Sequence, residues 1–199
     1  MIKAQDLAQV KAFARQDGVL LSLLWIISFA CWYGVMRHTG NNADISNVQQ
    51  MDTSFSILSL LSNLLIIATP FFVGWRLVRF RDDALNGAIS FRRGYAYSVY
   101  TFLYASLIFA VVHYLYFTFL DGGMFVNQMK MAIGQLQSLD KTAGTNYSSI
   151  FTEENFDLLK TMKPINWAFM FMLQNIGIGF LASLPIAFVC KRNHLIRKQ

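Results

Sequence analysis

Four long runs of apolar residues, none containing a charged side chain, constrain the fold of this chain more than any other feature. They occupy residues 19–36, 55–75, 95–120 and 165–190. A bilayer has a hydrocarbon core about 30 Å thick, which an α-helix of roughly 20 apolar residues can cross. We therefore expect an all-α integral membrane protein whose spans lie at about 19–36, 55–78, 95–120 and 165–190.

The composition excludes a soluble fold that buries the same helices. Hydrophobic residues make up 55% of the 199 residues and charged residues only 14%, against about 25% charged residues in typical soluble domains. Buried helices of soluble proteins are commonly about 10 to 14 residues long and keep a polar edge. The spans leave no room for a separate soluble domain, so residues 1–199 should form one membrane domain, a four-helix bundle.

The distribution of positive charge predicts the orientation in the membrane. Twelve of the 17 Lys and Arg residues lie before the first span, between the second and third spans, or after the fourth. Cytoplasmic segments are enriched in Lys and Arg, so both termini should be cytoplasmic. The two remaining connecting segments hold seven acidic and five basic residues. The net charge of +6 therefore reflects membrane topology rather than binding to nucleic acid.

Two segments outside the spans have helical patterns. In residues 1–18, Leu7, Val10 and Phe13 lie near one helical face beside basic residues, which predicts an interfacial N-terminal helix. The segment 121–164 is too long for a simple connector. Its apolar residues recur at helical spacing, at Phe125, Met129, Ile133 and Leu136. We expect it to form a helical extracytoplasmic loop that lies on the membrane surface or caps the bundle.

A few polar side chains interrupt the apolar spans and are the candidates for a polar interior: Ser59, Asn63, His113, Gln174 and Asn175. Two explanations remain open for the Ser and Asn residues. Such side chains usually join neighbouring helices, but they could also line a water-filled cavity. His113 is the one imidazole inside a span, and intramembrane ionisable residues are functional candidates. A packing histidine near the outer end of the span is the alternative.

Five arginines lie at or near the cytoplasmic segment between the second and third spans: Arg76, Arg79, Arg81, Arg92 and Arg93. Basic residues next to a membrane attract anionic headgroups, which makes these arginines candidate anionic-lipid contacts. The alternative is that they only fix the topology. Between its ends, no span contains Asp, Glu, Lys or Arg, which argues against a proton- or sodium-coupled pump.

No sequence motif indicates catalysis, a metal site or a cofactor. The chain has no H-E-x-x-H, no G-x-S-x-G, no phosphate-binding glycine loop and no Cys and His cluster with metal spacing. Cys31 and Cys190 lie at different depths in the proposed topology, too far apart for a disulfide, and are expected to be small packing residues. We therefore expect a protein that is not an enzyme and that binds no cofactor or metal.

Four short stretches resemble a known protein family. They are Gly18 at the start of the first span, residues 89–96 (ISFRRGYA) before the third, residues 119–121 (FLD) after it, and residues 183–187 (SLPIA) before the basic tail. On these stretches the chain resembles the domain of unknown function 4199 family, small four-span inner-membrane proteins of bacteria. The resemblance implies a multi-pass protein of the bacterial inner (cytoplasmic) membrane, and it implies no activity and no active-site residue.

Three classes of function are compatible with these features. A non-catalytic accessory or scaffold component of the membrane needs only apolar faces and small-residue contacts such as Gly179 with Ser183. The alternative is a carrier or lipid-handling protein for a neutral or lipid-linked solute, which would use the polar residues of the spans. A membrane enzyme has the least support. Expected partners are the lipid bilayer and either another membrane protein or a second copy of this chain, but not nucleic acid.

The topology can be tested by cysteine accessibility labelling. With single cysteines introduced at Ser46, Asn86 and Ser148, a membrane-impermeant reagent should label the first and third positions from outside the cell. Asn86 should react only after the membrane is opened, because it lies in the basic segment. Any other pattern would contradict the proposed orientation.

Overall fold

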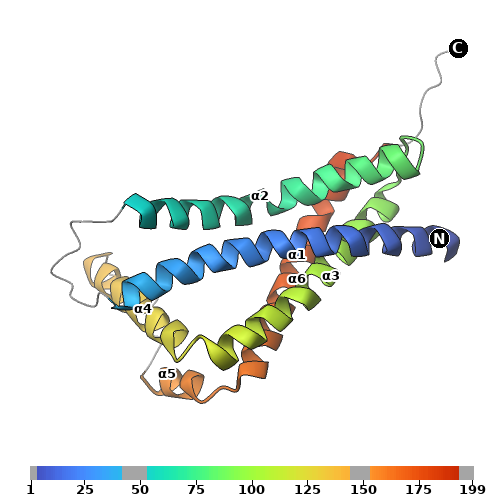
Figure 1. Cartoon of the computed structure of the whole chain (residues 1–199). Coiled ribbons are helices and arrows are strands. Elements are labelled where there is room, and N and C mark those ends of the chain that lie inside the picture. Colours follow the sequence, from blue (N-terminus) through green and yellow to red (C-terminus); the bar gives the residue numbers. More distant parts are fainter. Residues whose placement is uncertain (1–3, 42–52, 144–152, 193–199) are drawn as a thin grey trace, which may run out of the picture.

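The computed structural model describes residues 4–41, 53–143 and 153–192, and all regular elements in these ranges are helices (Figure 1). The helices are α1 (Ala4–Asn41), α2 (Thr53–Ala84), α3 (Phe91–Phe119), α4 (Met124–Ala143), α5 (Glu153–Lys160) and α6 (Pro164–Cys190). Four of them, α1, α2, α3 and α6, contain segments long and apolar enough to cross a membrane. The prediction of an all-α membrane bundle is confirmed.

The two ends of the bundle differ. The start of α1 and the end of α6 lie at one end, which we call the terminal end, whereas α4 and α5 lie at the other, which we call the loop end (Figure 1). At the terminal end, Ile89 and Arg192 exchange two backbone hydrogen bonds of 3.0 Å. These bonds fix the end of α6 against the short connection between α2 and α3.

Helix α1 is continuous over 38 residues. Its first turns do not lie apart on the membrane surface, because Val10 and Ala14 are fully buried in the core of the bundle. Phe13 also packs on Phe80 of α2, with ring centroids 4.9 Å apart. Residues 4–18 therefore form one continuous helix with the first span and pack into the bundle, and their place at the membrane interface stays a prediction.

Helix α3 packs closely against both α1 and α6 through two glycines. A Cβ atom added at Gly18 of α1 would lie 2.7 Å from the Cβ of Tyr104. One added at Gly179 of α6 would lie only 2.5 Å from the Cβ of Phe102, and Ser183 one turn further is fully buried. These small residues let the backbones approach, as is usual between membrane helices.

Helix α2 contacts α6 only at one end of the bundle. It lies along α1, and near the terminal end it meets α6, where the Cys190 thiol is 3.7 Å from the carbonyl oxygen of Gly74. Toward the loop end, α2 and α6 diverge (Figure 1). The bundle is therefore closed at the terminal end and wedge-shaped beyond it.

Helices α4 and α5 pack on the ends of α3 and α6 at the loop end. Their contact is a small apolar cluster centred on Val126, Phe156 and Trp167. The direction of α4 is set by Asp121, which accepts hydrogen bonds from the Tyr116 hydroxyl (2.8 Å) and from the backbone amide of Phe125 (2.9 Å). This arrangement places Phe125 over the loop end of the bundle.

The contact between α3 and α6 can be tested at two glycines of the same helix. Gly179→Ala should lower the free energy of unfolding by about 1–3 kcal/mol, because the new methyl group collides with Phe102. Gly177→Ala is the control, since no side chain or neighbouring helix lies within 4 Å of its added Cβ. Thermal unfolding in mild detergent measures both. Equal unfolding temperatures for the two variants would contradict the close contact.

Candidate functional site

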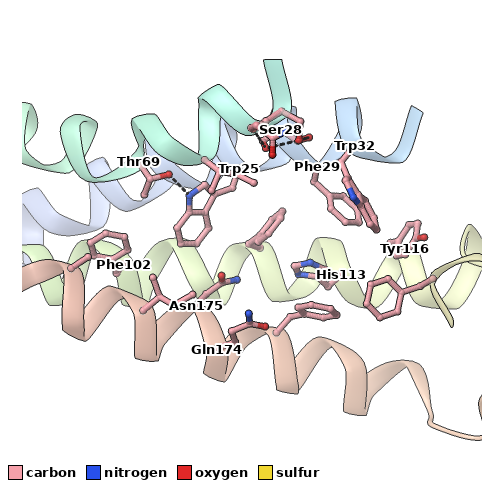
Figure 2. Close-up of a pocket in the computed structure, with 18 of the residues that line it drawn as sticks. Trp25, Ser28, Phe29, Trp32, Thr69, Phe102, His113, Tyr116, Gln174 and Asn175 are labelled. Atoms are coloured by element: carbon pink, nitrogen blue, oxygen red, sulfur yellow. Dashed lines mark hydrogen bonds between the residues drawn. The ribbon is translucent and has the colours of Figure 1, made fainter. Parts of the chain in front are cut away.

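A cavity of 570 Å³ lies in the wedge between the helices (Figure 2). It is lined by residues of α1, α2, α3, α4 and α6, and none of the lining side chains is Asp, Glu, Lys or Arg. Nine of the lining residues are aromatic: Trp25, Phe29, Trp32, Phe102, Phe109, Tyr116, Phe117, Phe125 and Phe171. Its volume falls within the range of about 300–1,000 Å³ that is typical of small-molecule sites.

One wall of the cavity is held by hydrogen bonds between α1 and α2. The Ser28 hydroxyl donates to the carbonyl oxygen of Ser62, and the Ser62 hydroxyl donates back to the carbonyl oxygen of Ser28, both at 3.0 Å. One to two turns nearer the terminal end, the Trp25 indole N–H donates to the Thr69 hydroxyl at 3.0 Å (Figure 2). Polar groups of the second span thus join two helices, as the sequence suggested for its serines.

His113 lies on α3 within a group of aromatic rings. Its imidazole stacks on Phe171 of α6 with centroids 4.8 Å apart, and it meets Phe109 and Phe29 edge to face at 4.2 and 5.1 Å. The residue is only 5% exposed. Its Nδ1 atom forms no well-aligned hydrogen bond within the described parts of the chain, although the imidazole interacts with the backbone of Phe109. A buried polar atom is usually satisfied, so this one needs an explanation.

The structure brings together four of the five candidate polar residues. Asn63, His113, Gln174 and Asn175 all line the cavity. Figure 2 shows His113 of α3 with Gln174 and Asn175 of α6 across from the wall formed by α1 and α2. Ser59 does not line the cavity; its carbonyl oxygen accepts a hydrogen bond of 2.9 Å from the Asn63 side chain.

The mouth of the cavity lies between α2 and α6. Ile66 and Ile178 both line the cavity and are each more than half exposed. Asn63 and Gln174 are also exposed. These exposed lining residues mark the open side of the cavity.

A second polar cluster, which we call the ionic cluster, consists of Asp17, Arg76 and Tyr97 and joins three helices near the terminal end. The Asp17 carboxylate is only 1% exposed and forms a salt bridge with Arg76, whose Nε donates to Oδ1 at 2.6 Å. The Tyr97 hydroxyl donates to the other carboxylate oxygen. Asp17 lies just before the expected first span and Arg76 at the end of the expected second span, and the structure shows that these two charges are paired across the helices.

The sequence contained a signal for Asp17 that was missed. Val10, Ala14, Asp17 and Leu21 are spaced by four, three and four residues, so they share one helical face. All four are buried. Asp17 therefore belongs to the buried stripe of α1, although it was assigned to a surface segment because it precedes the apolar run. Its partner Arg76 lies 59 residues away, a pairing that helical spacing alone cannot show.

The five arginines proposed as lipid contacts have different surroundings. Arg76 is paired with Asp17, and the Arg81 guanidinium binds Asp82 and the carbonyl oxygen of Cys190. Arg79 is exposed and lies 3.7 Å from Asp83. Arg92 is exposed and Arg93 is half-buried. Contact of these side chains with anionic lipid stays a prediction.

Metal-binding side chains do not gather in the described ranges. No group of three or more His, Cys, Asp or Glu residues there could hold a metal ion. Cys31 is half-buried on α1 and Cys190 is buried at the end of α6, and neither forms a disulfide.

A protein-family model matches this chain over a region that includes both the cavity and the ionic cluster. Residues 16–192 match the family model described as "Protein of unknown function (DUF4199)". The chain belongs to the DUF4199 family. The matched region begins one residue before Asp17 and includes every residue that lines the cavity. Comparison with curated proteins and with solved structures gave no match.

The ionic cluster can be tested by a double-mutant cycle. Asp17→Asn and Arg76→Gln should each lower the free energy of unfolding by about 3 kcal/mol, because each leaves a buried charge without its partner. The double variant should be clearly more stable than the sum of the two losses predicts. Unfolding in detergent provides the measurement.

The exposed pair of Arg79 and Asp83 provides the control for this cycle, since both side chains are more than half exposed. Asp83→Asn should change the free energy of unfolding by less than about 1 kcal/mol. Additive effects at Asp17 and Arg76, or an equal loss at Asp83, would contradict a buried interacting pair.

Proposed function

We propose that this membrane protein is a non-catalytic lipid-handling protein, which holds a neutral, lipid-like molecule in the cavity between α2 and α6. The observation that carries the proposal is a cavity without charged residues, on whose wall the Nδ1 atom of the buried His113 forms no well-aligned hydrogen bond in the described structure. A bound molecule with a hydrogen-bonding group would satisfy this atom.

The lining supports a largely apolar ligand. Aromatic rings form nearly half of it, and the amides of Asn63, Gln174 and Asn175 add a few polar groups. Small-molecule sites commonly combine an apolar wall with a small number of polar groups that fix the orientation of the ligand. A charged ligand would lose its hydration without gaining an opposite charge from the lining.

The orientation that we propose places the cavity in the outer half of the cytoplasmic membrane. Both termini are then cytoplasmic, and the basic segment 76–93 lies at the same side. The cavity extends along α3 from Phe102 to Phe117, toward the loop end. Its mouth would therefore admit molecules from the outer leaflet.

An accessory or scaffold role is the second candidate. Among the described side chains of α4 and α5, Met131, Leu136 and Leu158 are large, apolar and exposed. Such residues could contact another membrane protein at the loop end. This role is compatible with lipid handling, because the exposed residues and the cavity are separate.

Co-purification of lipids tests the proposed function. The protein is purified in mild detergent, and bound lipids are quantified by mass spectrometry relative to the total membrane extract. Ile178→Trp places an indole in the mouth of the cavity and should reduce the enriched lipid about fivefold or more, because little space remains. Leu181→Trp is the control, since Leu181 lies on the same helix, is highly exposed and does not line the cavity.

Two outcomes would overturn the proposal. One is a bound-lipid composition identical to that of the bulk membrane. The other is equal lipid enrichment in the Ile178→Trp and Leu181→Trp variants. The same preparations reveal any stoichiometric protein partner, which would support the accessory role.

A further inference from the structure

The aromatic lining of the cavity narrows the chemistry of its ligand. We propose that the ligand carries a planar, uncharged ring with oxygen substituents, of the quinone or hydroquinone type, attached to an apolar tail. This inference rests on the proposed function, because it assigns a ligand class to the same cavity. No electron transfer is part of it; the protein holds the ring.

Aromatic side chains face the cavity from four helices, with Trp25 on α1, Phe109 on α3, Phe125 on α4 and Phe171 on α6 among them. The rings already pack on each other in stacked and edge-to-face geometry, including His113 on Phe171 at an interplanar angle of 9°. Aromatic surfaces attract planar rings in these two geometries. A saturated chain gains only the apolar contact, so the lining favours a planar ring.

The polar groups match oxygen substituents on such a ring. Asn175 and Gln174 of α6 and His113 of α3 lie on one side of the cavity (Figure 2). Amide NH₂ groups donate hydrogen bonds to carbonyl oxygens, and amide oxygens accept them from hydroxyl groups. His113 can likewise donate from one ring nitrogen and accept at the other. The same residues can therefore bind the carbonyl and the hydroxyl form of the ring.

The absence of charge from the lining argues against a phospholipid headgroup. A phosphate placed among these residues would be desolvated with no cation to compensate it. Arg76 on α2 does not line the cavity and is engaged by the buried Asp17. A neutral ring avoids this cost, and its tail can leave through the mouth between Ile66 and Ile178 into the bilayer.

Three probe molecules distinguish how much the ring, its oxygen substituents and its tail each contribute to binding. Decylubiquinone has a ring, oxygen substituents and a ten-carbon tail; decylbenzene has the ring and tail; dodecanol has a tail and one hydroxyl group. Binding to the purified full-length protein in detergent is measured by titration calorimetry. We expect decylubiquinone to bind about tenfold or more tightly than either other probe, because it alone uses both the rings and the hydrogen-bonding groups.

Two variants test the assigned residues. Asn175→Leu and His113→Phe should each weaken decylubiquinone binding about five- to tenfold, because each removes hydrogen-bonding groups and keeps a similar volume. Decylbenzene binding should stay unchanged in both variants. Leu181→Asn is the control on the membrane-facing side of α6 and should bind all probes like the unmodified protein. Thermal unfolding shows whether each variant is folded, and Asn175, which is only half-buried, provides the test if His113→Phe does not fold.

The results distinguish the two proposals. If the three probes bind equally, or if decylubiquinone does not bind, the ring inference fails; lipid depletion by Ile178→Trp would then still support the proposed function. If decylubiquinone binds tightly but Asn175→Leu and His113→Phe have no effect, the assignment of the ring to this cavity fails. If Ile178→Trp leaves lipid enrichment unchanged, the proposed function itself fails.

Discussion

The buried salt bridge between Asp17 and Arg76 is the interaction on which the remaining architecture depends. With the Tyr97 hydroxyl, it joins α1, α2 and α3 at one level near the terminal end. A buried charge without its partner is costly, so the three helices must stay together at this level. Beyond it, α1 and α2 remain joined through Ser28 and Ser62, whereas α3 and α6 remain joined through Gly179. The cavity is the space left between α2 and α6, next to the aromatic rings that join α1 to α3.

The wedge stays open because of the side chains at its surface. Rigid aromatic rings, with few rotatable bonds, line both helix pairs, and many of them already contact each other. Filling the gap would require α2 to approach α6, but its position is fixed by hydrogen bonds to α1, including that of Trp25 with Thr69. The closely packed glycines have the opposite effect on α3 and α6, since they allow contact without a gap. Small residues therefore allow α3 and α6 to pack closely, whereas bulky aromatic residues line the gap between α2 and α6.

The sequence predicted four helices long and apolar enough to cross a bilayer, and the structure has them, because the thickness of the bilayer sets their minimum length. It also placed Asn63, His113, Gln174 and Asn175 within these helices. That these four residues meet at one cavity depends on the rotation of each helix and on the angle between α2 and α6, which no local pattern specifies. Asp17 was missed for a related reason. A charge beside an apolar run normally marks the end of a span, so the helical spacing that places Asp17 on the buried face was outweighed, and its pairing with Arg76 cannot be found from local spacing. The role of Phe125 follows in the same way from the direction of α4, which local spacing does not define.

Asp121 has a consequence that reaches beyond the end of α3. Its carboxylate fixes the turn into α4 through Tyr116 and the amides of Gly123 and Phe125. The Phe125 ring then lies against Phe117, Trp167 and Phe171 across the loop end of the cavity. If the cavity holds a ligand as we propose, this one acidic side chain would limit, through Phe125, how far the ligand can extend beyond the loop end of the cavity.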